Sequence, residues 1–289
     1  MRTLRNLMRR LRRFKLIALL LGVPALAFMI YAMLIEPRMV EVTQHDISID
    51  NLPSEFDGLR IVHLTDIHQG LWMSHEDVQR IVALTNSLKP DAVVITGDLV
   101  TRLFTDIPRL GRALGEIQAR HGVYAVLGNH DYWEDEDAIT EALIGNGIDV
   151  LFDESRTIRI GEGTIRIVGT DDLWGGSPNF DKAFEGIEER DVAIALAHTP
   201  DSALFMNGML ADLTLTGHTH GGLLNIPGYG AVLSSAGLGR KYVSGLHEIN
   251  GVRVYISRGL ARGTTLAPFR FRCRPEIAVF TLRQVGNKL

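Results

Sequence analysis

Five short apolar runs in this chain each end in a cluster of Asp, His, Asn or Gly residues, and this recurrence limits the fold more than any other feature of the sequence. The runs are IVHLT, AVVIT, VYAVL, AIALA and DLTLT, and they are followed by Asp66, Asp98, Asn129, His198 and His218. Short apolar runs bounded by turn residues are typical of buried strands. In open α/β sheets, functional groups gather beyond the carboxyl ends of the strands. We therefore expect the five run ends to meet at one edge of a layered structure.

Helical patterns separate several of these runs. The segment from Ser74 to Pro90 places Val78, Ile81 and Val82 at near-helical spacing, with Ser74 as a suitable N-cap and Pro90 as a stop signal. Similar patterns are present near residues 107–122, 135–145 and 180–189, whereas residues 170–178 read as a loop and the region up to Leu282 is mostly β-rich. Alternation of strands and helices, followed by β-rich sequence, predicts an α/β domain with at least one mixed sheet.

The N-terminal region has the composition of a membrane anchor. Residues 1–15 hold seven Lys and Arg residues and no acid, and residues 16–35 contain no charge. A helix over residues 16–35 would be about 30 Å long, which matches the hydrocarbon core of a bilayer. The positive-inside rule places the basic arm, 1–15, in the cytosol and residues 36–289 outside it. Two alternatives are a cleavable signal peptide and a shallow insertion that leaves the domain in the cytosol.

Beyond this anchor, we expect a linker and entry segment over residues 36–58 and one domain over 59–289. The net charge of the whole chain is −4, so the part that follows the basic arm is strongly acidic. An acidic body argues against general nucleic-acid binding, which needs a basic surface. The single cysteine, Cys273, excludes an intrachain disulfide framework.

The polar run ends together form a set of carboxylate, imidazole and amide groups. The set consists of Asp66, His68, Asp98, Asn129, His198, His218 and His220. It contains no thiolate, which excludes a structural zinc site of the Cys type. Seven ligands are too many for one transition metal with an open position, but they suit two metals that share a bridging carboxylate, an arrangement used in phosphate ester hydrolysis. Mixed nitrogen and oxygen ligands fit Mn, Fe, Zn or Co, and the choice stays open.

The motifs DIH, GDLVTR, GNHD, AHTPD and TGHTHGG, in this order, resemble the calcineurin-like metallophosphoesterase superfamily from about Leu59 to Leu282. The segments GTDDLW and YISRGL…RCRPEIAVFTL are similar to its membrane-associated bacterial branch, the YaeI/YkuE-type phosphodiesterases. The resemblance implies a layered β-sandwich of mixed sheets flanked by helices, which here follows the N-terminal transmembrane helix.

The resemblance also implies roles for individual residues. One ion is expected at Asp66, His68 and His220, the other at Asn129, His198 and His218, and Asp98 is expected to bridge them. His130 matches a catalytic histidine that is not a ligand and assists the leaving group or the phosphate, and Arg102 matches a substrate-binding arginine. Thr101 departs from the pattern, because several relatives have Asp at this place to pair with that histidine. Asp131, or a group from elsewhere, could orient His130 instead.

The implied function is that of a membrane-anchored phosphodiesterase that hydrolyses a lipid-borne or envelope phosphoester by means of a hydroxide bridging two divalent metal ions. The expected location is the bacterial inner membrane, with a single span and the catalytic domain outside the cytosol. A second reading is hydrolysis of the pyrophosphate of UDP-2,3-diacylglucosamine in lipid A biosynthesis, whose substrate faces the cytosol. A third is a membrane-tethered scaffold without catalysis. The oligomeric state and the natural substrate stay open.

Two further groups of residues are weaker candidates. Trp133 and Trp174 could line a lipid or sugar pocket, although packing at a loop explains them as well. Four basic residues could meet an anionic head group or simply face solvent: Arg240, Lys241, Arg258 and Arg262.

Overall fold

The structure is a computed structural model and describes residues 2–101, 105–232, 234–264 and 267–285. Arg102, the expected substrate-binding residue, lies outside the described residues.

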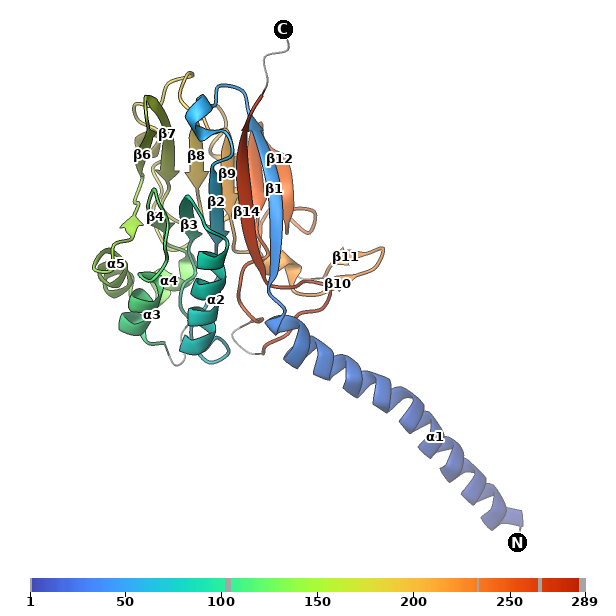
Figure 1. Ribbon diagram of the computed structural model, residues 1–289. Helices are drawn as coiled ribbons and strands as arrows, with labels where there is room; N and C mark the ends of the chain where they lie inside the picture. The colour runs from blue at the N-terminus through green and yellow to red at the C-terminus, as the bar shows by residue number, and fades with distance from the viewer. Residues whose placement is uncertain (1, 102–104, 233, 265–266, 286–289) are drawn as a thin grey trace.

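Two six-stranded sheets pack face to face (Figure 1). The first sheet has the order β1-β14-β2-β3-β4-β5 and consists of β1 (Glu41–Ile49), β2 (Arg60–Leu64), β3 (Ala92–Thr96), β4 (Val123–Val126), β5 (Asp149–Val150) and β14 (Glu276–Gln284). The second has the order β12-β13-β9-β8-β7-β6 and consists of β6 (Glu154–Ile160), β7 (Gly163–Gly169), β8 (Ala193–Leu196), β9 (Leu213–Thr216), β12 (Gly245–Ile249) and β13 (Val252–Ile256). Both are mixed, since parallel central strands are joined to antiparallel neighbours. A small hairpin, β10 (Asn225–Ile226) and β11 (Gly230–Ala231), stands apart from them.

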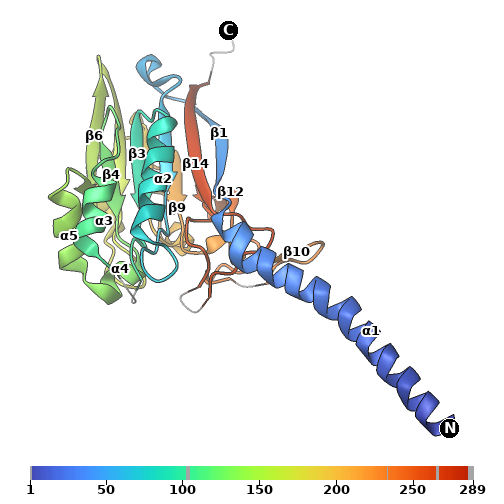
Figure 2. The ribbon, with the colours of Figure 1, turned by 60° about the horizontal axis from the view of Figure 1, so that its bottom comes forward.

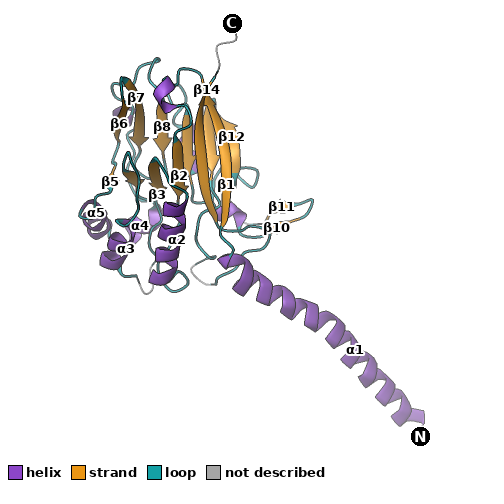
Figure 3. Ribbon diagram, in the orientation of Figure 1, coloured by secondary structure: helices purple, strands orange, loops and turns teal. Residues whose placement is uncertain are grey.

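Apolar side chains fill the space between the sheets and cover their outer faces. The inner layer joins Ile61 and Phe280 of the first sheet to Ile167 and Leu213 of the second, all fully buried. Helices α2 (His75–Ser87), α3 (Ile107–Leu114) and α5 (Glu136–Ile144) cover the outer face of the first sheet (Figure 3), while α6 (Phe180–Ala183) packs on the second. The predicted α/β sandwich of mixed sheets flanked by helices is therefore confirmed.

Local sequence explains where α2 begins and which face it buries. The Ser74 side chain accepts a hydrogen bond from the backbone N–H of Asp77, and the Asp77 carboxylate accepts one from the backbone of Ser74. This reciprocal pair satisfies backbone donors that a helix start otherwise leaves unpaired. Val78, Ile81 and Val82 then pack into the layer above the first sheet, as their spacing predicts.

Two segments differ from the expectation. Residues 36–58, expected as a linker and entry segment, contain β1, which pairs in parallel with β14 because Ile47 and Ile49 alternate into the core between the sheets. The helix expected over 180–189 ends at Ala183, shortly before Gly186, whose φ of +74° does not continue a right-handed helix.

A long helix, α1 (Arg2–Ile30), projects from the domain and is followed by a π turn over Tyr31–Ile35 (Figures 1 and 2). The part from Arg10 to Arg38 is long and apolar enough to cross a membrane, and 6% of its most apolar window is buried. α1 joins the domain at the end to which the carboxyl ends of β2, β3, β8 and β9 point (Figure 1). This is the end where the polar motifs are expected.

Candidate metal centre

The seven residues expected as ligands follow five strands whose carboxyl ends meet between the two sheets. Asp66 and His68 follow β2, Asp98 follows β3, Asn129 follows β4, His198 follows β8, and His218 and His220 follow β9. The first sheet contributes four of them and the second sheet three, so the site joins the two layers.

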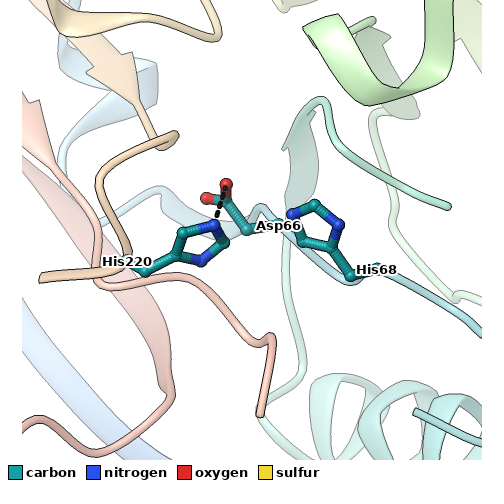
Figure 4. Close-up of side chains that lie close together, drawn as sticks. All are labelled: Asp66, His68 and His220. Carbon is teal, nitrogen blue, oxygen red and sulfur yellow. Dashed lines mark ion pairs between the residues drawn. The ribbon is translucent and has the colours of Figure 1, made fainter. Parts of the chain in front are cut away.

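Over the described ranges, three overlapping groups of side chains have the spacing of metal ligands, and one of them, His68, Asp98 and His130, shares one residue with each of the others. The ligand atoms of Asp66, His68 and His220 lie within 4.8 Å of one another (Figure 4), with 3.8 Å between His220 Nε2 and Asp66 Oδ1. Asp98, His198 and His218 form the second group, again within 4.8 Å. The first group consists of the residues expected for one ion, and the second combines the expected bridge, Asp98, with two of the three residues expected for the other ion, His198 and His218.

Asp98 lies between the two groups. Its Oδ2 atom is 3.3 Å from His68 Nε2 and 3.2 Å from His198 Nε2, which belong to different groups. Its other oxygen accepts a hydrogen bond of 2.8 Å from the backbone N–H of His130, and this bond fixes the carboxylate. One carboxylate that contacts both groups has the placement of a bridging ligand.

The backbone at the site is strained. Among the described residues, ten residues other than glycine have positive φ, and five of these are expected ligands: Asp66, His68, Asp98, His218 and His220, with φ between 49° and 67°. The left-handed region costs a residue with a Cβ about 1–2 kcal/mol, so it persists only where the surroundings enforce it. Strain of this kind concentrates at functional sites, and the sequence alone gave no sign of it.

Two glycines allow the backbone to pass close to these ligands. A Cβ on Gly128 would lie 2.4 Å from Asp98 Oδ1 and 2.8 Å from His198 Nδ1, and one on Gly217 would lie 2.4 Å from Asp66 Oδ2. The glycines that begin the motifs GNHD and GHTH are thus required by close packing against carboxylates, not only by turn geometry.

Neighbouring charges and burial shift the pKa values of the carboxylate and imidazole groups at the site in different directions. Burial opposes ionisation of Asp98, but the imidazoles of His198 and His68 outweigh it and hold the pKa of Asp98 well below its usual range. Burial favours a neutral His198, yet the Asp98 carboxylate prevails and raises the pKa of His198. Burial and neighbouring imidazoles lower the pKa of His218 to about 3 and that of His220 well below its ordinary value. Both rings are therefore neutral near pH 7, the form in which imidazole binds metals.

Unpartnered polar atoms test whether this donor set fits metal ions. Asn129 Oδ1, His218 Nε2 and His220 Nδ1 are buried and have no hydrogen-bond partner among the described residues. Leaving such atoms unpaired is costly unless something else binds them. These are nitrogen and oxygen donors of the kind that Mn, Fe, Zn or Co accepts, so the residues fit a pair of such ions.

Asp131 supports the centre in a way that differs from the expectation. Its carboxylate accepts hydrogen bonds from the backbone of Leu99, Val100 and Gly128, at 2.8, 3.3 and 2.9 Å. It therefore holds together the two loops that carry Asp98 and Asn129. Thr101, the departure from the family pattern, is buried in the wall of the cavity beside the centre.

A cavity of about 210 Å³ opens beside the centre and is lined by His68, His130, His220 and Arg262, among others. The ring of His130 lies 4.6 Å from that of His68 and 4.9 Å from that of Trp133. On the other side, the ring of Trp174 lies 4.8 Å from that of His218. Both tryptophans are half exposed, so they flank the centre rather than the core.

The other basic candidates lie elsewhere. Arg258 pairs with Glu41 and Glu276, while Arg240 and Lys241 lie over tyrosine rings. Sequence reasoning missed Arg270, which is fully buried, donates to the carbonyls of Ala261 and Arg258, and lies 3.5 Å from the carbonyl of His220. A single arginine in a β-rich tail carries no pattern that could have singled it out.

Comparison with known proteins agrees with this geometry. A family model described as calcineurin-like phosphoesterase matches residues 59–222. The chain is 33% identical over 260 residues to the metallophosphoesterase YkuE of Bacillus subtilis (strain 168), covering 89% of this chain and 90% of that protein. It is 30% identical over 253 residues to the phosphodiesterase YaeI of Escherichia coli (strain K12), covering 86% and 90%. It is also 33% identical over 262 residues to a transmembrane protein with metallophosphoesterase domain of Danio rerio, covering 86% of this chain and 58% of that one.

A match over more than half of the chain, together with these identities, places the strand-end motifs in a known family. The chain therefore belongs to the calcineurin-like phosphoesterases and is a metal-dependent phosphoester hydrolase.

Proposed function

We propose that this protein is a membrane-anchored phosphodiesterase with two divalent metal ions, acting on a lipid-borne or envelope phosphodiester. The observation that carries the proposal is the position of Asp98, whose Oδ2 atom contacts a histidine of each ligand group. One ion would be held by Asp66, His68 and His220, the other by Asn129, His198 and His218, and Asp98 would serve both.

Two divalent ions at these residues would supply a nucleophile from water near neutral pH and neutralise charge on the phosphate. The chain's own groups prepare the site for this. Asp98 is ionised because His198 and His68 hold its pKa low, so one negative charge is available to both ions. Asn129 contributes a neutral oxygen, which preserves the net positive charge that attracts a phosphodiester. His130 lines the cavity and donates a proton to the departing oxygen, a role worth about 10²–10⁴-fold in rate.

The membrane part of the proposal rests on α1. Its central residues carry exposed apolar side chains such as Leu20 and Leu21, which need a nonpolar surrounding. The Danio rerio relative, which is named a transmembrane protein with metallophosphoesterase domain, supports the same arrangement. We propose one span over residues 16–35 in the bacterial inner membrane, with the basic arm in the cytosol and the catalytic domain outside it.

The activity is tested with the full-length chain in detergent and the soluble diester bis(p-nitrophenyl) phosphate, with Mn²⁺, Zn²⁺, Fe²⁺ or Co²⁺ added separately. Wild type hydrolyses the diester with at least one of these ions, whereas Asp98→Asn and His218→Ala lose turnover and part of their bound metal. Near-wild-type turnover in both variants would contradict the two-ion site. A reporter fused after Leu289 tests the orientation, and a cytosolic reporter would overturn it.

A further inference from the structure

A second cavity, of about 910 Å³, lies beside the metal pocket. Its lining begins at Pro37, just after the π-helix Tyr31–Ile35 that follows α1. We call it the juxtamembrane groove. Its walls are the segment Pro37–Glu41, the loop 71–74 and one face of α2, together with Leu260, Arg262 and Arg274. The groove and the metal pocket share Trp72, Met73 and Arg262, so a single wall leads from one to the other.

The lining of the groove is amphiphilic. Ile81, Met73 and Leu260 are buried beneath it, and Leu71 and Met39 are 44% and 37% exposed, so its surface has an apolar stretch that water reaches. Four arginines border this stretch: Arg38, Arg80, Arg262 and Arg274. An apolar surface edged by guanidinium groups matches an amphiphile with an anionic head.

The positive charge of the rim is only partly compensated, because the lining has four arginines and two carboxylates, Asp77 and Glu41, and Glu41 pairs with Arg258, which does not line the groove. Asp77 pairs with Arg262 at 2.6 Å and with Arg80 at 2.9 Å, so one carboxylate serves two arginines. Within the described part of the chain, Arg38 and Arg274 have no carboxylate within 4.0 Å. A phosphate group could therefore bind at this rim without displacing an existing ion pair of these two residues.

The end of α1 and the π-helix that follows it are bound to the domain next to the groove. The backbone N–H of Arg270 donates to the carbonyl of Ala32 at 2.9 Å, and the rings of Phe28 and Phe271 lie 4.9 Å apart. Leu34 and Ile35, just before the groove, are about half exposed and belong to the apolar stretch of the anchor. With the proposed span over residues 16–35, the end of the membrane-embedded segment would lie next to Pro37, the first residue of the groove.

We propose that the juxtamembrane groove binds an anionic glycerophospholipid drawn from the leaflet in which α1 ends. The upper parts of its acyl chains lie on Leu71 and Met39. Its single phosphodiester is first held among Arg38, Arg262 and Arg274, and the wall shared with the metal pocket then leads this same group to the metal centre. This inference rests on the proposed function, since it names the substrate class of the same metal centre.

The test uses the full-length chain in nanodiscs of phosphatidylcholine that contain a small fraction of phosphatidylglycerol with a photoactivatable diazirine in its acyl chain. After illumination, the labelled peptides are mapped by mass spectrometry. We expect label on peptides of Pro37–Glu41 and of residues 71–84, in addition to α1. Leu71→Glu places a carboxylate on the apolar stretch and should reduce groove labelling about tenfold. A tenfold loss of affinity corresponds to roughly 1.4 kcal/mol of binding free energy. Labelling of α1 is unchanged in this variant.

The matched control is Leu246→Glu, because Leu246 on β12 is 45% exposed and lies outside the groove. Its groove labelling stays at the wild-type level. Arg274→Ala tests the rim separately and lowers labelling by phosphatidylglycerol but not by an equally labelled phosphatidylcholine. Each of three results would overturn the proposal. They are label confined to α1, groove labelling that Leu71→Glu does not change, and equal labelling by the two lipids.

The same preparations are assayed with bis(p-nitrophenyl) phosphate, which separates the two proposals. Hydrolysis of this soluble diester without groove labelling overturns the lipid site and leaves the phosphodiesterase standing. Groove labelling without hydrolysis, in protein that carries two ions, contradicts the phosphodiesterase and supports the lipid site.

Discussion

Gly128→Ala is the sharpest test of how tightly the centre is packed. Gly128 has φ −114° and ψ 172°, which any residue adopts, so the substitution adds no backbone strain. The new methyl group would lie 2.4 Å from Asp98 Oδ1 and 2.8 Å from His198 Nδ1. Contacts of this kind normally lie near 3.5 Å, so the carboxylate must shift by about 1 Å. A displacement of that size can cost about 10²-fold in rate.

The assay measures kcat/KM for bis(p-nitrophenyl) phosphate, the bound metal per chain and the unfolding temperature. We expect about a hundredfold loss in kcat/KM, equivalent to about 2.7 kcal/mol, together with weaker metal binding. The control is Gly111→Ala in α3, whose methyl group would lie 2.7 Å from the Ala142 carbonyl, in the contact between α3 and α5. It affects stability but not metal content. Wild-type kcat/KM and full metal content in Gly128→Ala would refute this description of the centre.

Three further predictions concern other parts of the site and core. His130→Ala keeps both ions, as measured by metal analysis, but lowers kcat about 10²–10⁴-fold; unchanged kcat would remove its role as proton donor. Removing the ions with a chelator lowers the unfolding temperature, because binding at a hundred times Kd stabilises the folded chain by about 2.7 kcal/mol; an unchanged thermal transition would argue against ions at these ligands. Burial lowers the pKa of His63 to about 3, below the 6.5 of an exposed histidine, so only the unfolded chain takes up this proton between those values. The free energy of unfolding is therefore highest above about pH 6.5 and falls by about 1.4 kcal/mol per pH unit as the pH drops toward 3. In denaturation titrations at pH 7 and pH 5.5, His63→Gln should weaken this dependence, and an identical dependence in both proteins would contradict it.

The fold and the clustering of the candidate ligands could be predicted because their signals are local. Apolar runs of four or five residues with turn residues after them specify strands, and the helix from His75 follows from its N-cap and from Val78, Ile81 and Val82. The order of the strand-end motifs then restricts which side chains can meet, since parallel strands bring their carboxyl ends to one edge.

Other features depend on contacts between distant segments and could not be predicted in the same way. β1 pairs with β14, more than 200 residues later, and the sequence around Glu41 does not indicate this partner. Asp131 is next to His130 in the sequence, but its carboxylate turns to the backbone of Leu99 and Val100. The juxtamembrane groove is formed by α2 and the chain that follows α1, and neither segment has a motif that indicates a cavity.

In the proposed centre, one carboxylate, that of Asp98, joins two metal sites. Crystals of the full-length chain grown with Mn²⁺ and measured at the manganese absorption edge test it directly. We expect two anomalous peaks about 3.5–4 Å apart, one on each side of the Asp98 carboxylate. Two results would contradict the shared carboxylate, provided that the crystals hydrolyse bis(p-nitrophenyl) phosphate. One is a single peak, and the other is two peaks with Asp98 bound to neither.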